Sequence, residues 1–217
     1  MNTNKPIKGL IRFSFNSASG NLLIGAIACF ALGLALLITG SNTVYPFFVA
    51  SAIAFLPMFL MTGTGGNATS KWERFQISMP VRRKDVVSSL YLGIIIASIV
   101  GVPFLLLVSG LSVVLHESLL DYVASTVIEN FMTFLGVPLL SGALFYPLAF
   151  TIGENKGEAL VIVCSFGAIG FVIFASWLGG MANLTGNTIS VLIIAISAIS
   201  FAVSYAITNT IYAKKDF

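Results

Sequence analysis

Two long stretches of the chain lack charged residues and are rich in apolar side chains. Residues 13–70 and 86–116 contain no Lys, Arg, Asp or Glu. The hydrocarbon core of a bilayer is about 30 Å thick, and a helix needs about 20 apolar residues to cross it. Runs of this kind recur along the chain and predict six membrane spans, at Asn21–Thr39, Tyr45–Thr62, Ser89–Leu115, Val123–Ile152, Ala159–Trp177 and Thr188–Tyr212.

The composition and the form of these runs favour helices. Hydrophobic residues make up 57% of the chain and charged residues 9%, whereas soluble domains are about a quarter charged. The runs are continuously apolar, whereas barrel strands alternate over about ten residues. We therefore expect an all-α polytopic membrane protein with six transmembrane helices. The fourth run exceeds a simple crossing, and Pro138 and Pro147 predict kinks or a break in it.

The basic residues indicate the orientation of the spans. With the N-terminus inside, the inner segments 1–20, 63–88, 153–158 and 213–217 hold all 11 Lys and Arg residues. Because Lys and Arg are retained on the cytoplasmic side, both termini and the loop at 63–88 are predicted to be cytoplasmic. The same bias accounts for the net charge of +3, so no nucleic-acid partner is expected.

Residues 1–20 are predicted to form an amphipathic helix that precedes a single transmembrane domain at 21–217. Ile7, Leu10, Ile11 and Phe15 recur at helical spacing, and Lys5, Lys8 and Arg12 form a stripe on another face. This pattern is typical of a helix that lies in the inner headgroup layer of a membrane. The alternative is a solvated basic segment that leads into the first span.

The loop at 63–88 gathers charge that its flanks lack. Residues Lys71–Asp85 hold seven of the nineteen Lys, Arg, Asp and Glu residues. Trp72, Phe75 and Met79 are spaced to share one face of a short helix, which Pro80 is expected to end. Such a helix either lies on the inner leaflet or fits a groove of a soluble protein, and the periodicity favours neither.

Two segments resemble small six-helix permeases of type-2 ABC exporters. After span two, these permeases carry an aromatic-rich short helix, then S-[LM]-P-[VI]-x-[RK], an acidic residue, valines and an aromatic residue. The chain is similar there, with "KWERFQISMPVRRKDVVSSLYL". Between spans four and five, "PLAFTIGENKGEALVIV" resembles the family pattern P-L-x-F-x-x-G-x-x-K-G, although basic residues common near Thr151 and Glu158 are missing. Among these exporters, the chain most resembles permease subunits of phenol-soluble-modulin exporters.

The resemblance implies a coupling site and partners. The loop helix would be a coupling helix seated in a groove of a separate cytoplasmic ABC ATPase, through Trp72, Phe75, Met79, Arg82, Arg83, Lys84 and Asp85. A second cytoplasmic loop would contain Glu154, Lys156 and Glu158. A second permease subunit, identical or different, would complete the transporter among the lipids of the bacterial plasma membrane. The substrates would be amphipathic peptides or lipid-like molecules, moved out of the cell.

No cofactor is expected to bind this chain itself, and ATP and Mg would bind the ATPase. The glycine-rich segment "GTGGNATSK" lacks the spacing G-x-x-x-x-G-K-[ST] of a phosphate-binding loop. No metal site is expected either, because the chain has one histidine and both Cys29 and Cys164 fall within predicted spans. The chain is therefore predicted to be a transport subunit without its own enzymatic activity.

Small residues recur every four positions in two spans, at Gly25, Cys29 and Gly33 and at Gly93, Ala97 and Gly101. Such stripes let helix backbones approach closely. They indicate packing within the bundle or an interface between subunits.

Glu129 is the ionisable residue that the pattern places inside a span. It lies either at the outer headgroup level or inside the membrane with a functional role. A secondary transporter or channel is the alternative to an ATP-driven exporter. That class places ionisable residues at mid-membrane, and here Glu129 is the candidate.

Overall fold

The computed structural model describes residues 4–65, 82–152 and 157–214. These residues are helical apart from short turns, and six helices are long and apolar enough to cross a membrane. The predicted all-α class and the six spans are confirmed. The elements are α1 (Asn4–Ser17), α2 (Ser19–Thr39), α3 (Val44–Ala50), η1 (Ser51–Phe55), α4 (Leu56–Gly65), α6 (Arg83–Leu115), η2 (Glu117–Leu119), α7 (Leu120–Ile152), α8 (Gly157–Met181) and α9 (Gly186–Lys214).

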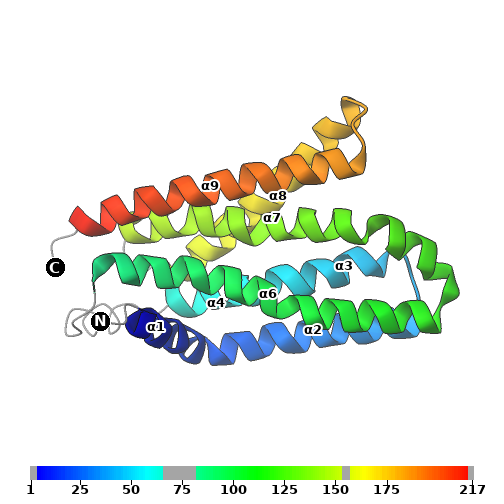
Figure 1. Cartoon of the computed structure of the whole chain (residues 1–217), viewed down its shortest axis with the longest axis horizontal. Helices are drawn as coiled ribbons and strands as arrows, with labels where there is room; N and C mark the ends of the chain where they lie inside the picture. Colours follow the sequence, from blue (N-terminus) through cyan, green and yellow to red (C-terminus); the bar gives the residue numbers. More distant parts are fainter. Residues whose placement is uncertain (1–3, 66–81, 153–156, 215–217) are drawn as a thin grey trace.

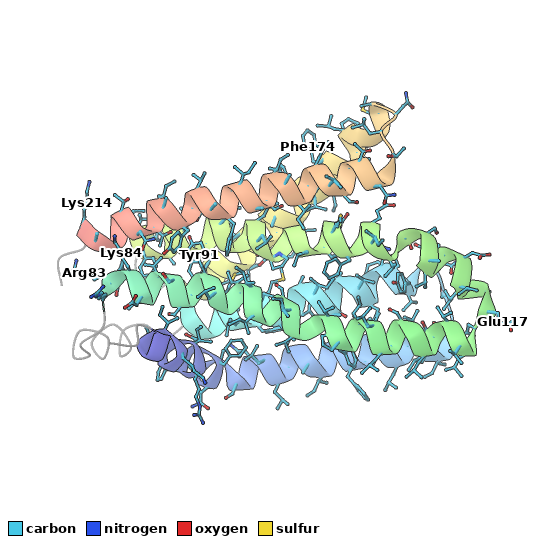
Figure 2. The ribbon with its side chains drawn as sticks, in the orientation of Figure 1. Arg83, Lys84, Tyr91, Glu117, Phe174 and Lys214 are labelled. Atoms are coloured by element: carbon cyan, nitrogen blue, oxygen red, sulfur yellow. The ribbon has the colours of Figure 1, made fainter. Side chains whose placement is uncertain are left out.

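The spans run back and forth along one direction, so that the described chain ends lie at the same end of the bundle (Figure 1). Figure 2 shows Arg83, Lys84 and Lys214 at this end and Glu117 at the opposite end. Helix α1, which carries Lys8 and Arg12, also lies there. We call this the basic end of the bundle, and the other the opposite end.

Helix α1 lies at an angle to α2 and packs against α6 and α4 (Figure 1). Leu10 and Ser14 are buried on its packed side, as is Ala18 directly after the helix, and Lys8 and Arg12 are exposed. The amphipathic pattern therefore orients one helix face toward the bundle. Whether the helix lies in a headgroup layer stays a prediction.

Span two lies at the centre of the bundle and is not a regular α-helix. A π-helix, η1, separates α3 from α4, and Phe48, Val49, Ser51, Ala52 and Ile53 are fully buried. A π turn pairs a carbonyl with the N–H five residues on. For Ala52 this partner is Pro57, which has no N–H. Proline therefore leaves Ala52 without a backbone donor in this register, and Gly101 of α6 approaches that carbonyl so closely that a β-carbon would overlap it.

Span four is a single continuous helix, so a break at its prolines is excluded. Pro138 and Pro147 both lie inside α7. Pro147 cannot donate to the carbonyl of Ala143, four residues earlier, but Ser204 of α9 donates its hydroxyl to that oxygen at 2.6 Å. Neighbouring Ser and Thr side chains satisfy backbone groups freed by proline in membrane helices, and here the donor comes from another span.

The long contact between α7 and α9 is lined by hydroxyl groups. Ser190, Ser197 and Ser204 recur every seven residues along α9, and all three are buried. Thr133 of α7 faces Ser190, with hydroxyl oxygens 2.9 Å apart. Gly136 sits where a β-carbon would meet the Ser197 hydroxyl at 3.0 Å. Small polar residues thus allow these two spans to approach closely.

Candidate functional site

The candidate site is the start of α6, where residues 66–81 join the bundle. Arg82 is extended, with φ −70° and ψ 138°, and the helix begins at Arg83. Asp85 lies in the first turn, where the partial positive charge of the helix N-terminus favours a carboxylate. Arg82, Arg83 and Lys84 are exposed. The chain passes directly from residues 66–81 into α6, so this helix start is one of the two points at which those residues are tied to the bundle, the other being the end of α4 at Gly65.

Arg83 connects the start of α6 to the end of α9. Its Nη1 atom donates to the carbonyl oxygen of Ala213 at 2.9 Å and lies 3.4 Å from that of Tyr212. The last carbonyls of a helix lack intrahelical partners and carry partial negative charge. The guanidinium therefore stabilises the C-terminus of α9 while it attaches that terminus to α6.

A directed chain of hydroxyl groups joins α6, α9 and α7 two turns deeper. The Tyr91 hydroxyl lies 2.7 Å from Ser204 Oγ and 2.8 Å from Thr208 Oγ1. Ser204 has one hydroxyl hydrogen and donates it to the Ala143 carbonyl. Ser204 must therefore accept from Tyr91, and Tyr91 in turn accepts from Thr208. The order of donation is Thr208 to Tyr91 to Ser204 to Ala143, which crosses three spans.

Aromatic rings surround the same tyrosine. The Tyr91 ring centroid lies 4.9 Å from that of Tyr146, 4.8 Å from Phe201 and 5.3 Å from Tyr205. Ser88 donates to the Lys84 carbonyl at 2.8 Å, so it accepts from the Tyr205 hydroxyl, also at 2.8 Å. Tyr91 is 3% exposed. These contacts make the basic ends of α6, α7 and α9 one packed unit.

Several residues predicted for the coupling site lie outside the described residues. Trp72, Phe75 and Met79 belong to 66–81, and Glu154 and Lys156 belong to 153–156. Glu158 lies in the first turn of α8, but its side chain is not described. The described part of the predicted site is therefore the four-residue run 82–85. The structure adds to it Arg83's contact with α9 and the hydroxyl chain at Tyr91.

The two small-residue stripes both face span two. On α2, a β-carbon at Gly25 would meet Phe59, and one at Gly33 would lie 3.3 Å from Phe48. On α6, one at Gly93 would lie 3.2 Å from Leu60. Ala97 is 1% exposed between Gly93 and Gly101. The structure thus places both stripes inside the bundle, around the π-helix and its flanking helices.

Residues 15–213 match the family described as ABC-2 family transporter protein. The chain belongs to this family. No curated protein and no solved structure matches it.

Membership of the ABC-2 family also indicates which subunits the chain works with. Membrane subunits of this family lack nucleotide-binding domains and associate with an ABC ATPase subunit. This ABC-2 permease is accordingly a multi-pass membrane protein and a transport subunit, and it depends on a separate chain for ATP hydrolysis.

Glu129 of the ABC-2 permease belongs to α7 and lies beside the N-terminus of α9, the start of span six. Its side chain is half-buried, and a β-carbon on Gly186, the first residue of α9, would overlap its carboxylate. Glycine therefore allows the carboxylate to approach the N-terminus of α9, where a negative charge is stabilised. The contact places Glu129 level with the N-terminus of α9.

The residues that sequence reasoning missed are hydroxyls within apolar helices. Ser204 and Thr208 lie on one face of α9, and Tyr91 entered only as part of a motif. The seven-residue recurrence of Ser190, Ser197 and Ser204 was the available signal, because polar residues repeated on one face of a span face the bundle.

Proposed function

We propose that this ABC-2 permease is the membrane half of an ATP-driven exporter, with both termini and residues 63–88 in the cytoplasm. The described Lys and Arg residues gather at the basic end, which is the cytoplasmic end if the positive-inside bias holds. A cytoplasmic ABC ATPase binds at that end through a coupling helix that contains Trp72, Phe75 and Met79. ATP and Mg bind the ATPase, and a second permease subunit completes the transporter.

The observation that carries this proposal is the attachment of α6 to α9 directly after the coupling segment. Arg83 holds the C-terminus of α9, and Tyr91 joins α9 to α6. ATPase closure displaces the coupling helix, and these contacts move the basic ends of α6, α7 and α9 together. A rigid-body shift of packed helices is a recurrent way to alternate access between two sides.

The interior favours an amphipathic substrate without ion coupling. Among the described residues, no Lys, Arg, Asp or Glu is buried, and Glu129 lies beside the N-terminus of α9. Secondary transporters use ionisable residues at the midplane. Hydroxyls in an apolar bundle suit amphipathic peptides or lipid-like molecules, the substrate class suggested by the resemblance to phenol-soluble-modulin exporters.

The test begins with ATPase binding. We expect replacement of Trp72 and Phe75 by Ala to weaken association by ~2–4 kcal/mol, the range for interface hot spots, which is about 30- to 1000-fold. The matched control replaces Arg82 and Lys84, which should weaken association less and in a salt-dependent manner. Co-purification of the ATPase with tagged permease measures both. Full retention by the double aromatic variant would contradict the coupling helix.

A second variant separates binding from coupling. Tyr91→Phe removes the hydroxyl that joins α6 to α9 and leaves residues 66–81 unchanged. We expect the ATPase to co-purify fully while export driven by ATP falls, because the displacement is transmitted less completely. Wild-type export by a well-folded Tyr91→Phe permease would show that the hydroxyl chain is not part of coupling.

A further inference from the structure

An apolar groove lies between α2 and α6, and η1 contributes to its lining. Its volume of about 460 Å³ falls within the usual range for ligand pockets, roughly 300–1,000 Å³. Small side chains leave this space open where larger ones would fill it. The residues that line the groove include Ala26, Cys29, Phe30, Ala52, Gly101 and Phe104.

The groove opens on the outer surface of the described bundle. Ile27 is 60% exposed and Phe30 and Val100 are each 56% exposed, and all three line the groove. Its mouth therefore faces whatever surrounds the spans.

The groove also lies at the middle of its span. Cys29 is the central residue of α2, which runs from Ser19 to Thr39. At a rise of 1.5 Å per residue, it is about 15 Å from each helix end. The hydrocarbon core is about 30 Å thick, so the groove opens near the bilayer midplane.

We propose that this groove binds one acyl chain of a membrane lipid. Water is absent at this depth, and the side chains that line the groove are apolar apart from the Cys29 thiol. A peptide would bring backbone N–H and C=O groups that need partners in hydrocarbon, and the side chains of this lining offer none beyond the Cys29 thiol. An acyl chain carries no such groups, and it reaches the groove directly from the bilayer. The site is separate from the coupling contacts at Arg83 and Tyr91.

Photolabelling tests the proposal with the full-length permease in vesicles. The vesicles contain phosphatidylcholine and phosphatidylglycerol, with a trace of phosphatidylcholine that carries a diazirine at the end of one acyl chain. After irradiation, mass spectrometry maps the labelled peptides. We expect the groove segments of α2 and α6 to be labelled several-fold more than the exposed face of α8 around Gly170, because a bound chain stays near them longer than bulk lipid does.

Filling the groove should remove this excess. Ala26 is exposed and lines the groove, so Ala26→Trp fills it without entering the core. We expect groove labelling to fall about tenfold, which corresponds to ~1.4 kcal/mol of binding free energy. The matched control is Ala31→Trp, on an exposed position of the same helix that does not line the groove; labelling should be unchanged.

Three results would overturn the proposal. Equal labelling of the groove and of α8 in the wild-type permease would indicate only exchanging lipid. Undiminished groove labelling in a well-folded Ala26→Trp permease would place the label elsewhere. A disulfide between two Ile27→Cys permeases, together with absent groove labelling, would show that a second copy of the chain covers the groove.

Discussion

Ser204→Ala should destabilise the bundle. Pro147 has no N–H to donate to the Ala143 carbonyl, and among the described side chains Ser204 is the one that donates to this oxygen. The Ser204 hydroxyl donates to Ala143 at 2.6 Å. Tyr91 loses its acceptor in the variant but keeps Thr208 at 2.8 Å, so the main loss is the bond to the carbonyl. Hydrogen bonds between membrane helices contribute ~0.6 kcal/mol on average and up to ~1.7. A short bond to a carbonyl without its own helical donor belongs near the upper value.

A second substitution separates this cause from general damage. Pro147→Ala restores an N–H at position 147, which can donate to the Ala143 carbonyl in the ordinary helical manner. Ser204→Ala should then lower the free energy of unfolding less in the Pro147→Ala permease than in the wild type. We expect a coupling free energy of at least ~0.5 kcal/mol, above the additivity expected of independent sites.

Unfolding of the purified permease in mixed detergent micelles, titrated with SDS, measures these free energies. Ser197→Ala is the matched control: Ser197 is also buried on α9, but its hydroxyl bonds within the helix, to Ile193 at 2.6 Å. We expect Ser197→Ala to lower the free energy of unfolding only slightly, and by the same amount with Pro147 or Ala at position 147. Equal penalties for Ser204→Ala with and without Pro147 would refute the link between that proline and Ser204.

Three further outcomes are expected. Gly101→Ala should lower stability by ~1–3 kcal/mol, the usual cost of overpacking, because the new methyl group overlaps the backbone of η1. The control Gly110→Ala, in open space on the same helix, should be neutral or stabilise by up to ~1 kcal/mol. Equal melting temperatures of the two variants would contradict this. Glu129→Gln should leave export within a few-fold of wild type, and complete loss with normal ATPase binding would favour ion coupling. In a cysteine-free background, cysteine labels should find Ser70 cytoplasmic and Ser118 external, whereas labelling of both from one side would contradict six spans.

The positions of the spans could be read from the sequence because hydropathy and length set them. The helix of the third span begins at Arg83, before the start of the predicted span at Ser89. The hydropathy signal starts later because the first turns of this helix lie at the basic end and carry charge. The continuity of α7 could not be read in this way. Proline is a local signal for a break, but its remedy is Ser204, a residue of another span that only the tertiary packing brings to Ala143.

The candidate site was predictable only in part. Charge and a family motif indicated the loop and the run from Arg82 to Asp85. The contact of Arg83 with α9 depends on where two helix ends meet, which no local pattern specifies. The small-residue stripes predicted close packing of spans, and their partner, span two, became visible only in three dimensions.

The π-helix in span two sets the direction in which the chain leaves the bundle. A π turn accommodates one more residue than an α turn, and each residue advances an α-helix by about 100° around its axis. Among the buried positions, Tyr45, Phe48 and Ala52 are three and four residues apart, whereas Pro57 follows Ala52 by five residues and Met61 follows Pro57 by four. Deleting one residue of η1 would therefore rotate α4 by about a quarter turn relative to α3. The end of α4 at Gly65 would then lie on a different side of the basic end, so the point from which the proposed coupling segment starts depends on one residue at the centre of the membrane domain.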